Sequence, residues 1–238
     1  MKKNYWPLIL FALYTVGFIL YFVGNYRDIG AILLIIAVIS HMVYTFSPVQ
    51  RAAISMLNAR RSLELGNVEK AKEYVIKAAK LNKNYPHVGY LLSTSKKTFP
   101  FYERLARELE DYAKNESDST YMKYVIASIY YHIGNLEKTI SILYSVPEKN
   151  RNTEIARLLG TALLESGKPE EAIEVFKKHE KKEGLPTKEE LAILIGLGLC
   201  YAEKKDRKKA EKYYLKVKKF NPDFPELNVL RDKIYPHD

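Results

Sequence analysis

The stretch LGLCYAEKKDRKKAEKYYLKVKKFNP, from Leu197 to Pro222, decides the fold class. It has the pattern of two short helices joined by a polar turn at Lys205. Similar turns occur at Gly66, Gly134 and Gly167. Gly66 and Gly134 are 68 residues apart, which is twice 34, and the later spacings are 33 and 38. The period therefore predicts a hidden unit with its turn at Pro100, and five units in all.

Residues at fixed distances from these five turn markers have matching sizes. Seven residues before each marker the residue is small, as close approach of two helices requires: Ala59, Ser93, Ala127, Gly160 and Gly198. Five residues after each marker stand Ala71, Leu105, Thr139, Ala172 and Ala210. Nine residues after each marker the residue is large or branched: Val75, Leu109, Leu143, Phe176 and Tyr214. This pattern predicts an all-α solenoid in which helical hairpins stack on one another.

The fifth unit resembles the tetratricopeptide repeat family, whose unit is a helix–turn–helix of about 34 residues. The residues that carry the resemblance are Leu197, Gly198, Tyr201, Ala210, Tyr214 and Pro222. The likeness extends from Val49 to the C-terminus and is poorest in the second unit. There Lys96 replaces a large residue and Pro100 replaces the glycine of the turn.

The solenoid is expected to occupy residues 48–238. Its units are predicted at 52–85, 86–119, 120–152, 153–186 and 191–224, followed by a capping helix at 225–235. Pro225 suits the first turn of that cap, and Leu227, Leu230 and Ile234 form its apolar side. At the other end Ser47 is the predicted N-cap of the first repeat helix, with Pro48 at its first position.

Residues 1–47 have a different composition. No charged residue occurs from Asn4 to Tyr26, and none from Ile29 to Gln50. Each run exceeds the ~20 apolar residues needed to cross a bilayer as a helix. The short segment GNYRDIG, from Gly24 to Gly30, predicts a tight turn between two antiparallel spans. The alternative, a cleaved signal peptide, is disfavoured by the length of the first run and by the lack of an A-x-A cleavage pattern.

The orientation of this hairpin follows from the basic residues beside it. Lys2 and Lys3 precede the first span, and Arg51, Arg60 and Arg61 follow the second. Basic flanks favour the cytoplasmic side. We therefore expect an integral protein of the cell membrane, with two spans and with both termini and the solenoid in the cytoplasm.

No pattern typical of catalysis occurs in the sequence. The five histidines lie in different units and lack metal-ligand spacing, and there is no phosphate-binding loop. The single cysteine, Cys200, excludes an intramolecular disulfide framework. We predict no enzyme activity, no cofactor and no metal site.

The resemblance implies a site instead. Tetratricopeptide arrays bind extended or helical peptides in a concave groove lined by the first helix of each unit. Mapped onto this sequence, the groove candidates are Met56, Arg60, Tyr90, Tyr121, Tyr124, Tyr131, His132, Arg157 and Leu164. Tyr121, Tyr124 and Tyr131 share one helical face, and large amphipathic side chains of this kind are favoured interface anchors.

A second candidate surface is basic, in a chain with a net charge of +10. It comprises Lys204, Lys205, Arg207, Lys208, Lys209 and Lys212. Such density can attract anionic lipid, an acidic protein or nucleic acid. A solvated helix face is the simplest interpretation. Of the functional interpretations, lipid or an acidic protein is preferred over nucleic acid because the chain is expected to be membrane-bound.

Two functions remain open at this point. The first is a membrane-anchored scaffold that recruits a protein or peptide to the cytoplasmic membrane face. The second is a structural subunit of a larger membrane assembly, whose hairpin packs against partner spans. Small residues that would allow such packing are Gly17, Gly24, Gly30 and Ala37. No oligomeric state is predicted.

Overall fold

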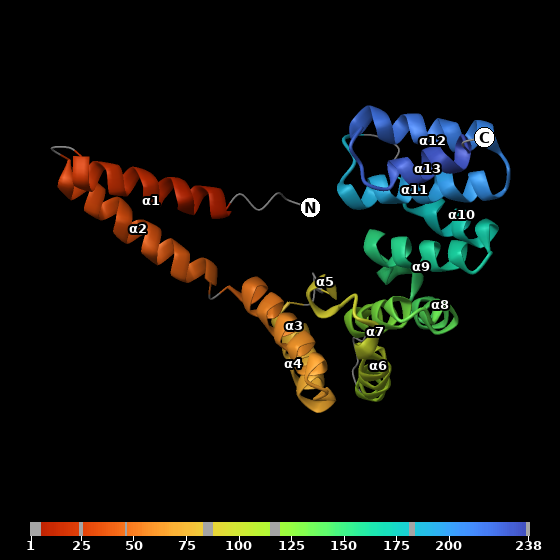
Figure 1. Ribbon diagram of the computed structural model, residues 1–238, viewed down its shortest axis with the longest axis horizontal. Helices are drawn as coiled ribbons and strands as arrows, with labels where there is room; N and C mark the ends of the chain where they lie inside the picture. The colour runs from red at the N-terminus through yellow and green to blue at the C-terminus, as the bar shows by residue number, and fades with distance from the viewer. Residues whose placement is uncertain are drawn as a thin grey trace.

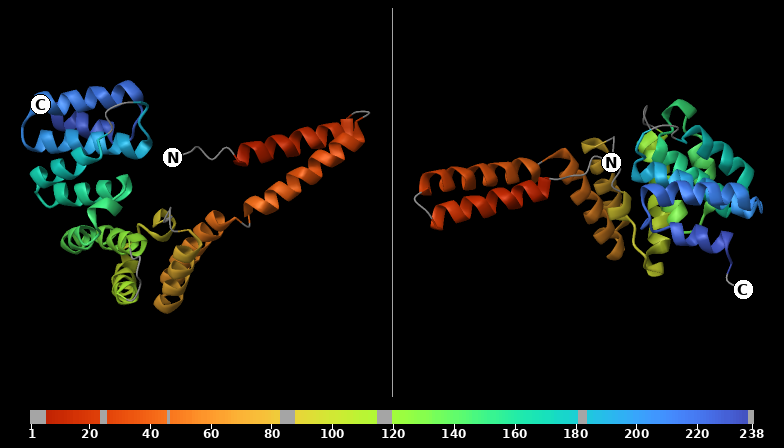
Figure 2. Two further views of the ribbon diagram at one scale, coloured as in Figure 1. Left: turned by 180° about the vertical axis from the view of Figure 1, so that it is seen from behind. Right: turned by 90° about the horizontal axis from the view of Figure 1, so that it is seen from above.

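The computed structural model describes residues 6–23, 26–45, 47–82, 88–114, 120–180 and 184–236. Within these ranges all regular structure is helical, so the predicted all-α class is confirmed. A two-helix hairpin projects away from a curved stack of helices, as Figures 1 and 2 show. The two parts meet between residues 45 and 48.

The hairpin consists of α1 (Trp6–Val23) and α2 (Arg27–Thr45). Its two helices pack through small residues, since Gly17, Gly30 and Ala37 are all buried between them. A Cβ atom on Gly30 would lie 2.4 Å from the backbone nitrogen of Tyr21. The prediction that Gly30 belongs to the turn was wrong: α2 begins at Arg27, and Gly30 lies in its first turn against α1. Gly24 lies outside the described residues.

Only one helix of the described chain meets the length and hydropathy of a membrane span. This stretch is Arg27–Tyr44 in α2, with a mean hydropathy of 1.7. The apolar stretch Ile9–Phe22 in α1 is shorter. The two-span hairpin therefore stays a prediction.

The junction between hairpin and solenoid is short and hydrogen-bonded. Ser47 caps α3 (Pro48–Glu64) by accepting from the backbone N–H of Gln50, and Pro48 opens the helix, as predicted. The Ser47 N–H donates to the Tyr44 carbonyl over 3.1 Å. The Gln50 side chain also donates to the Tyr44 hydroxyl. These bonds tie the end of α2 to the start of the first repeat.

Four repeats have two regular helices each. They are α3 with α4 (Val68–Leu81), α7 (Thr120–His132) with α8 (Leu136–Tyr144), α9 (Thr153–Glu165) with α10 (Pro169–Lys178), and α11 (Lys188–Glu203) with α12 (Arg207–Phe220). The turn markers between the paired helices all have positive φ: 75° at Gly66, 83° at Gly134, 74° at Gly167 and 60° at Lys205. Glycine adopts this conformation without strain, whereas lysine does not.

The residues at the predicted small positions lie in the core, where neighbouring helices contact one another. Ala59, Ser93, Ala127, Gly160 and Gly198 are all buried. The Phe176 ring shows why glycine is needed: a Cβ on Gly160 would lie 2.4 Å from it, and a Cβ on Gly196 would lie 2.5 Å from it. This ring from α10 is therefore held between α9 of its own repeat and α11 of the next.

The second unit departs from the prediction. Its first helix is reduced to the single turn α5 (Val88–Leu91), followed by a 3₁₀ turn η1 (Lys96–Thr98) and by α6 (Phe99–Ala113). Pro100 lies in the first turn of α6 and not in the turn between the two helices. Proline lacks the N–H that the first turn leaves unbonded, so it is suited to this position. The buried Tyr102 hydroxyl donates to the Leu91 carbonyl over 2.6 Å and fastens α5 to α6.

The C-terminal end is closed by α13 (Leu227–Ile234). Leu227, Leu230 and Ile234 are buried as predicted, but Pro225 lies in the turn before the helix. Tyr214, predicted to fill the gap to a next unit, is only half-buried. Its neighbour Tyr213 is buried instead and stacks on Tyr201, with ring centroids 5.8 Å apart.

The stacked units form an arc. In Figure 1 the first helices α5, α7, α9 and α11 lie on its inner side, and the second helices α6, α8, α10 and α12 lie on its outer side. The open side of the arc is turned toward the hairpin.

Candidate partner-binding face

Half-buried side chains occur at matching positions of α7 and α9, which are two of the helices on the inner side of the arc. Tyr121, Tyr124 and Tyr131 come from α7, and the residues 33 positions later on α9 are Glu154, Arg157 and Leu164. Because the repeat length is the same, these six residues occupy matching positions on neighbouring helices. We call them the inner face.

The tyrosines of the inner face also contribute to packing. Tyr121 packs against the buried cluster that runs from Ala52 to Tyr130, and Tyr131 against the cluster that runs from Ala127 to Ile234. Tyr124 packs against both. Burial raises the pKa of all three hydroxyls. These rings therefore contribute to the core as well, because the two clusters meet beneath α7.

One of these tyrosines joins two repeats. The Tyr131 hydroxyl donates to Oε1 of Glu165 over 2.6 Å, from α7 to the end of α9. Burial and this carboxylate both hold the Tyr131 pKa above its usual value. The hydrogen bond therefore links the third repeat to the fourth.

Sequence reasoning missed Glu154. Burial raises the pKa of its carboxyl, and the negative charge of Glu189 on α11 raises it further, while Arg157 acts in the opposite direction. The signal that could have found it is its spacing of 33 residues from Tyr121. The inner face therefore combines aromatic rings, a half-buried acid and a guanidinium, all of which can contact a polypeptide.

The remaining groove candidates have different surroundings. Arg60 pairs with Glu64 over 2.9 Å on α3, and Tyr90 is exposed on α5. The His132 ring lies 5.4 Å from the rings of Phe99 and Tyr102, and it hydrogen-bonds the Ser93 carbonyl, so it joins the second and third units.

Met56 was predicted to face the groove, and this was wrong. Its side chain is fully buried. The short helix α5 packs against α3 and contributes Leu91 to the same buried cluster as Met56.

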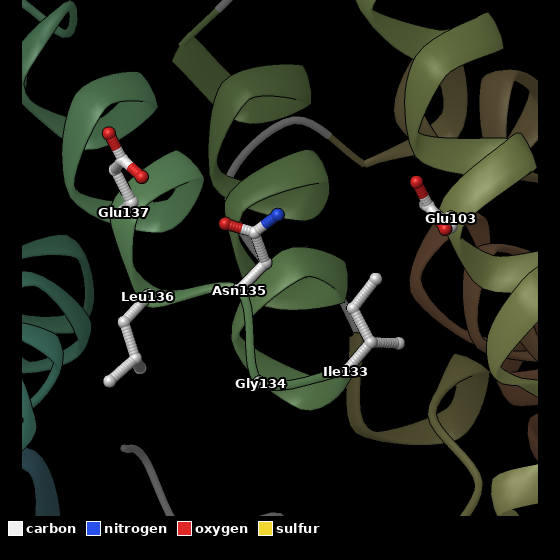
Figure 3. Close-up of a pocket in the computed structure, with 6 residues that line it drawn as sticks. All are labelled: Glu103, Ile133, Gly134, Asn135, Leu136 and Glu137. Atoms are coloured by element: carbon white, nitrogen blue, oxygen red, sulfur yellow. The ribbon is translucent and has the colours of Figure 1, made fainter.

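A shallow depression of about 520 Å³ lies elsewhere, beside the α7–α8 turn (Figure 3). It is lined by Glu103, Ile133, Gly134, Asn135, Leu136 and Glu137. Among the residues that the structure describes, no group of three acidic, histidine or cysteine side chains could hold a metal ion.

The predicted basic surface divides into paired and unpaired residues. Lys204 pairs with Glu170 of the preceding repeat, and Lys209 pairs with Asp206 over 2.8 Å. The Arg207 guanidinium lies 4.8 Å from the centre of the Tyr235 ring. Lys205 lies in the turn between α11 and α12 with a positive φ, and Lys208 and Lys212 are exposed on α12.

Comparison with known proteins gives the following similarities. YrrB, described as a TPR protein with an unusual peptide-binding site, is 17% identical, with a TM-score of 0.48; the match covers 82% of this chain and 97% of that chain. Nearly identical TPR-like repeats of a Podosopora anserina protein described as a kinesin light chain are 14% identical, with a TM-score of 0.38; here 77% of this chain and 96% of that chain are covered. No curated protein sequence matches.

The tetratricopeptide repeat family model matches residues 62–85 and 191–224. These segments include α4 of the first repeat and α11 with α12 of the fifth. These two segments are therefore similar to tetratricopeptide repeats.

Proposed function

We propose that this protein is a membrane-anchored scaffold that binds a protein or peptide partner on its inner face, at the cytoplasmic surface of the cell membrane. The anchor is the α1–α2 hairpin, and the binding element is the repeat arc. The observation that carries the proposal is the apolar outer surface of the hairpin, joined to the arc without a flexible linker.

That outer surface is unsuited to water. Large apolar side chains are exposed along both helices, including Phe11, Phe18, Phe22, Ile29, Ile32, Ile36, Ile39 and Val43. Soluble proteins rarely expose so large a continuous apolar surface. The Thr15 hydroxyl donates to the Phe11 carbonyl over 2.8 Å, so this polar group is satisfied within its own helix, as a lipid environment requires.

The inner face supports the binding part of the proposal. Half-buried tyrosines and an arginine are the residue types most often found as energetic anchors of interfaces. They lie on the side of the arc that tetratricopeptide repeats use for peptides, according to the resemblance described above. A rigid array of this kind can bind an extended segment without reorganising.

The structural-subunit alternative has less support than the scaffold. It depended on small residues that were free to contact partner spans. Instead, Gly17 on α1 is buried against α2, and Gly30 and Ala37 on α2 are buried against α1. We therefore propose the scaffold alone.

Cysteine labelling in intact cells tests the anchoring. The native Cys200 is buried, which raises its thiol pKa to about 12, so it reacts slowly and needs no replacement. A membrane-impermeant maleimide should label Asn25→Cys in intact cells, and Lys188→Cys only after permeabilisation. Labelling of position 188 without permeabilisation would refute the cytoplasmic location, and release of the protein by alkaline carbonate would refute the anchor itself.

A further inference from the structure

The exposed surface of α12 differs from that of every other second helix in the described arc. The exposed residues of α4, α6, α8 and α10 include acids next to bases, such as Glu69 with Lys70 and Glu174 with Lys177. The exposed residues of α12 include no acid: they are Arg207, Lys208, Lys209, Lys212, Leu215, Lys218, Lys219 and Phe220. A face that only keeps the protein soluble would have the mixed charges of the other helices.

Four of these residues form a straight row. Lys208, Lys212, Leu215 and Lys219 follow one another at spacings of four, three and four residues, so they lie on one side of the helix. The opposite side carries the buried Ala210, Tyr213 and Val217. We call this row the lysine stripe. Leu215, in its middle, is 54% exposed.

The cations beside the stripe are engaged within the molecule. Arg207 lies over the Tyr235 ring, and the Lys218 ammonium lies 5.7 Å from the centre of the Tyr214 ring. Lys216 pairs with Glu180 over 3.1 Å. Within the described part of the chain, none of the three stripe lysines has a hydrogen-bond, ion-pair or ring partner. Their charges are therefore available to another molecule.

The direction of α12 argues against the lipid headgroups of the protein's own membrane as the binding partner of the stripe. In Figures 1 and 2, α12 runs along the hairpin and not across it. If the hairpin spans the membrane, as proposed above, α12 is closer to the membrane normal than to the membrane plane. A helix in this position cannot lay one side flat on lipid headgroups, as an interfacial helix does. The stripe is directed sideways, above the membrane surface.

We propose that the lysine stripe is a docking surface for an acidic helical segment of a partner protein. The stripe extends over 12 residues, from Lys208 to Lys219, and spans roughly 16 Å of helix, which is about three turns of a partner helix. Carboxylates opposite Lys208, Lys212 and Lys219 would neutralise all three charges, and an apolar residue opposite Leu215 would remove it from water. This surface lies on the outer side of the arc, so it can be occupied together with the inner face.

The test uses the full chain in detergent and in nanodiscs of zwitterionic lipid. The probe is a synthetic helical peptide that carries Glu, Glu, Leu and Glu at the same spacings as the stripe. Its control is a peptide of equal composition in scrambled order. The stripe variant is Lys208→Glu/Lys212→Glu/Lys219→Glu. The matched variant, Lys70→Glu/Lys77→Glu/Lys80→Glu, makes the same change of net charge on the exposed side of α4.

We expect the stripe variant to bind the ordered peptide at least tenfold more weakly than the unchanged chain, and the α4 variant to bind it within about twofold. Leu215→Ser should weaken binding severalfold. Equal loss in both triple variants, or equal binding of the scrambled peptide, would overturn the proposal. So would no peptide binding, or stripe-dependent binding to phosphatidylserine vesicles or duplex DNA in place of the peptide. Failure to enter nanodiscs would count against the anchor alone, because the detergent measurement does not depend on it.

Discussion

The hairpin and the fourth repeat are built in the same way but present opposite surfaces. In both, two antiparallel helices approach through glycine: Gly30 lies against the Tyr21 backbone, and Gly160 lies against the Phe176 ring. The outer side of the hairpin carries isoleucine and phenylalanine, whereas the outer side of α10 carries Glu170, Glu174 and Lys178. The small residues thus set how two helices pair, and the outward residues set which solvent surrounds the pair.

The strongest test exchanges the outward residues of one region for those of the other. Ile32→Lys/Ile36→Lys places two cations on the exposed side of α2 and should oppose membrane insertion by about 5–7 kcal/mol in total. The matched change Leu65→Lys/Val229→Lys, at exposed apolar positions of the arc, should have no effect on location. Membrane fractionation measures both. If the α2 variant stays in the membrane fraction, the proposed role of that surface is refuted.

The contrast between packing residues and outward-facing residues can also be tested within one helix, α7. Ile126→Ala removes a buried side chain and should lower the free energy of unfolding by about 2–5 kcal/mol. Tyr121→Ala/Tyr124→Ala also removes packing against the core clusters and should cost a similar amount, but in addition it should lower partner binding by about 2 kcal/mol or more.

Urea unfolding and partner titration separate the two effects. The more conservative Tyr121→Phe/Tyr124→Phe keeps the packing and serves as the control. If the alanine pair binds the partner as well as the unchanged chain does, the inner face is not the binding surface.

A smaller effect on stability is expected when only a small residue at a helix contact is replaced. Gly160→Ala introduces a methyl group 2.4 Å from the Phe176 ring, and overpacking of this kind costs about 1–3 kcal/mol. Gly89→Ala is the control, since a methyl group there meets nothing within 4 Å. Thermal unfolding followed by circular dichroism distinguishes them. Equal melting temperatures would show that the ring moves aside freely.

The smallest expected effect includes an increase in stability. Lys205→Gly places glycine at the positive φ that lysine now adopts, and should stabilise the fifth repeat by about 1 kcal/mol. Gly167→Ala, at the same position of the fourth repeat, should destabilise it by a similar amount. Both changes leave the helix contacts untouched. A destabilised Lys205→Gly would contradict the assignment of strain to this turn.

Much of the fold was predictable because the repeat imposes the same geometry on each unit. The small residues were located by their fixed distance from the turn markers, and all of them are buried. The four markers that stand between paired helices have positive φ. The second unit was not predictable in this way. Pro100 was taken for a turn residue because of the period, while the local preference of proline for the first turn of a helix placed it in α6.

The candidate site was predictable only in part. Helical spacing predicts that Tyr121, Tyr124 and Tyr131 share one side of α7, and in the structure all three are half-buried. It could not show that these rings also cover the joint between two core clusters, nor that α5 buries Met56, since both depend on contacts between units. It also could not distinguish Lys204 and Lys209, which are paired, from Lys208 and Lys212, which are not.

The short junction at Ser47 has a consequence for how a partner would be found. The hydrogen bonds that Ser47 and Gln50 donate to Tyr44 limit the freedom between the hairpin and the arc. If the hairpin is inserted in a bilayer, as proposed, the protein would diffuse laterally and rotate only about the membrane normal. Partners held in the same membrane meet it in two dimensions, where tethering raises the effective concentration. Partners with a membrane attachment of their own therefore have a kinetic advantage over freely soluble ones.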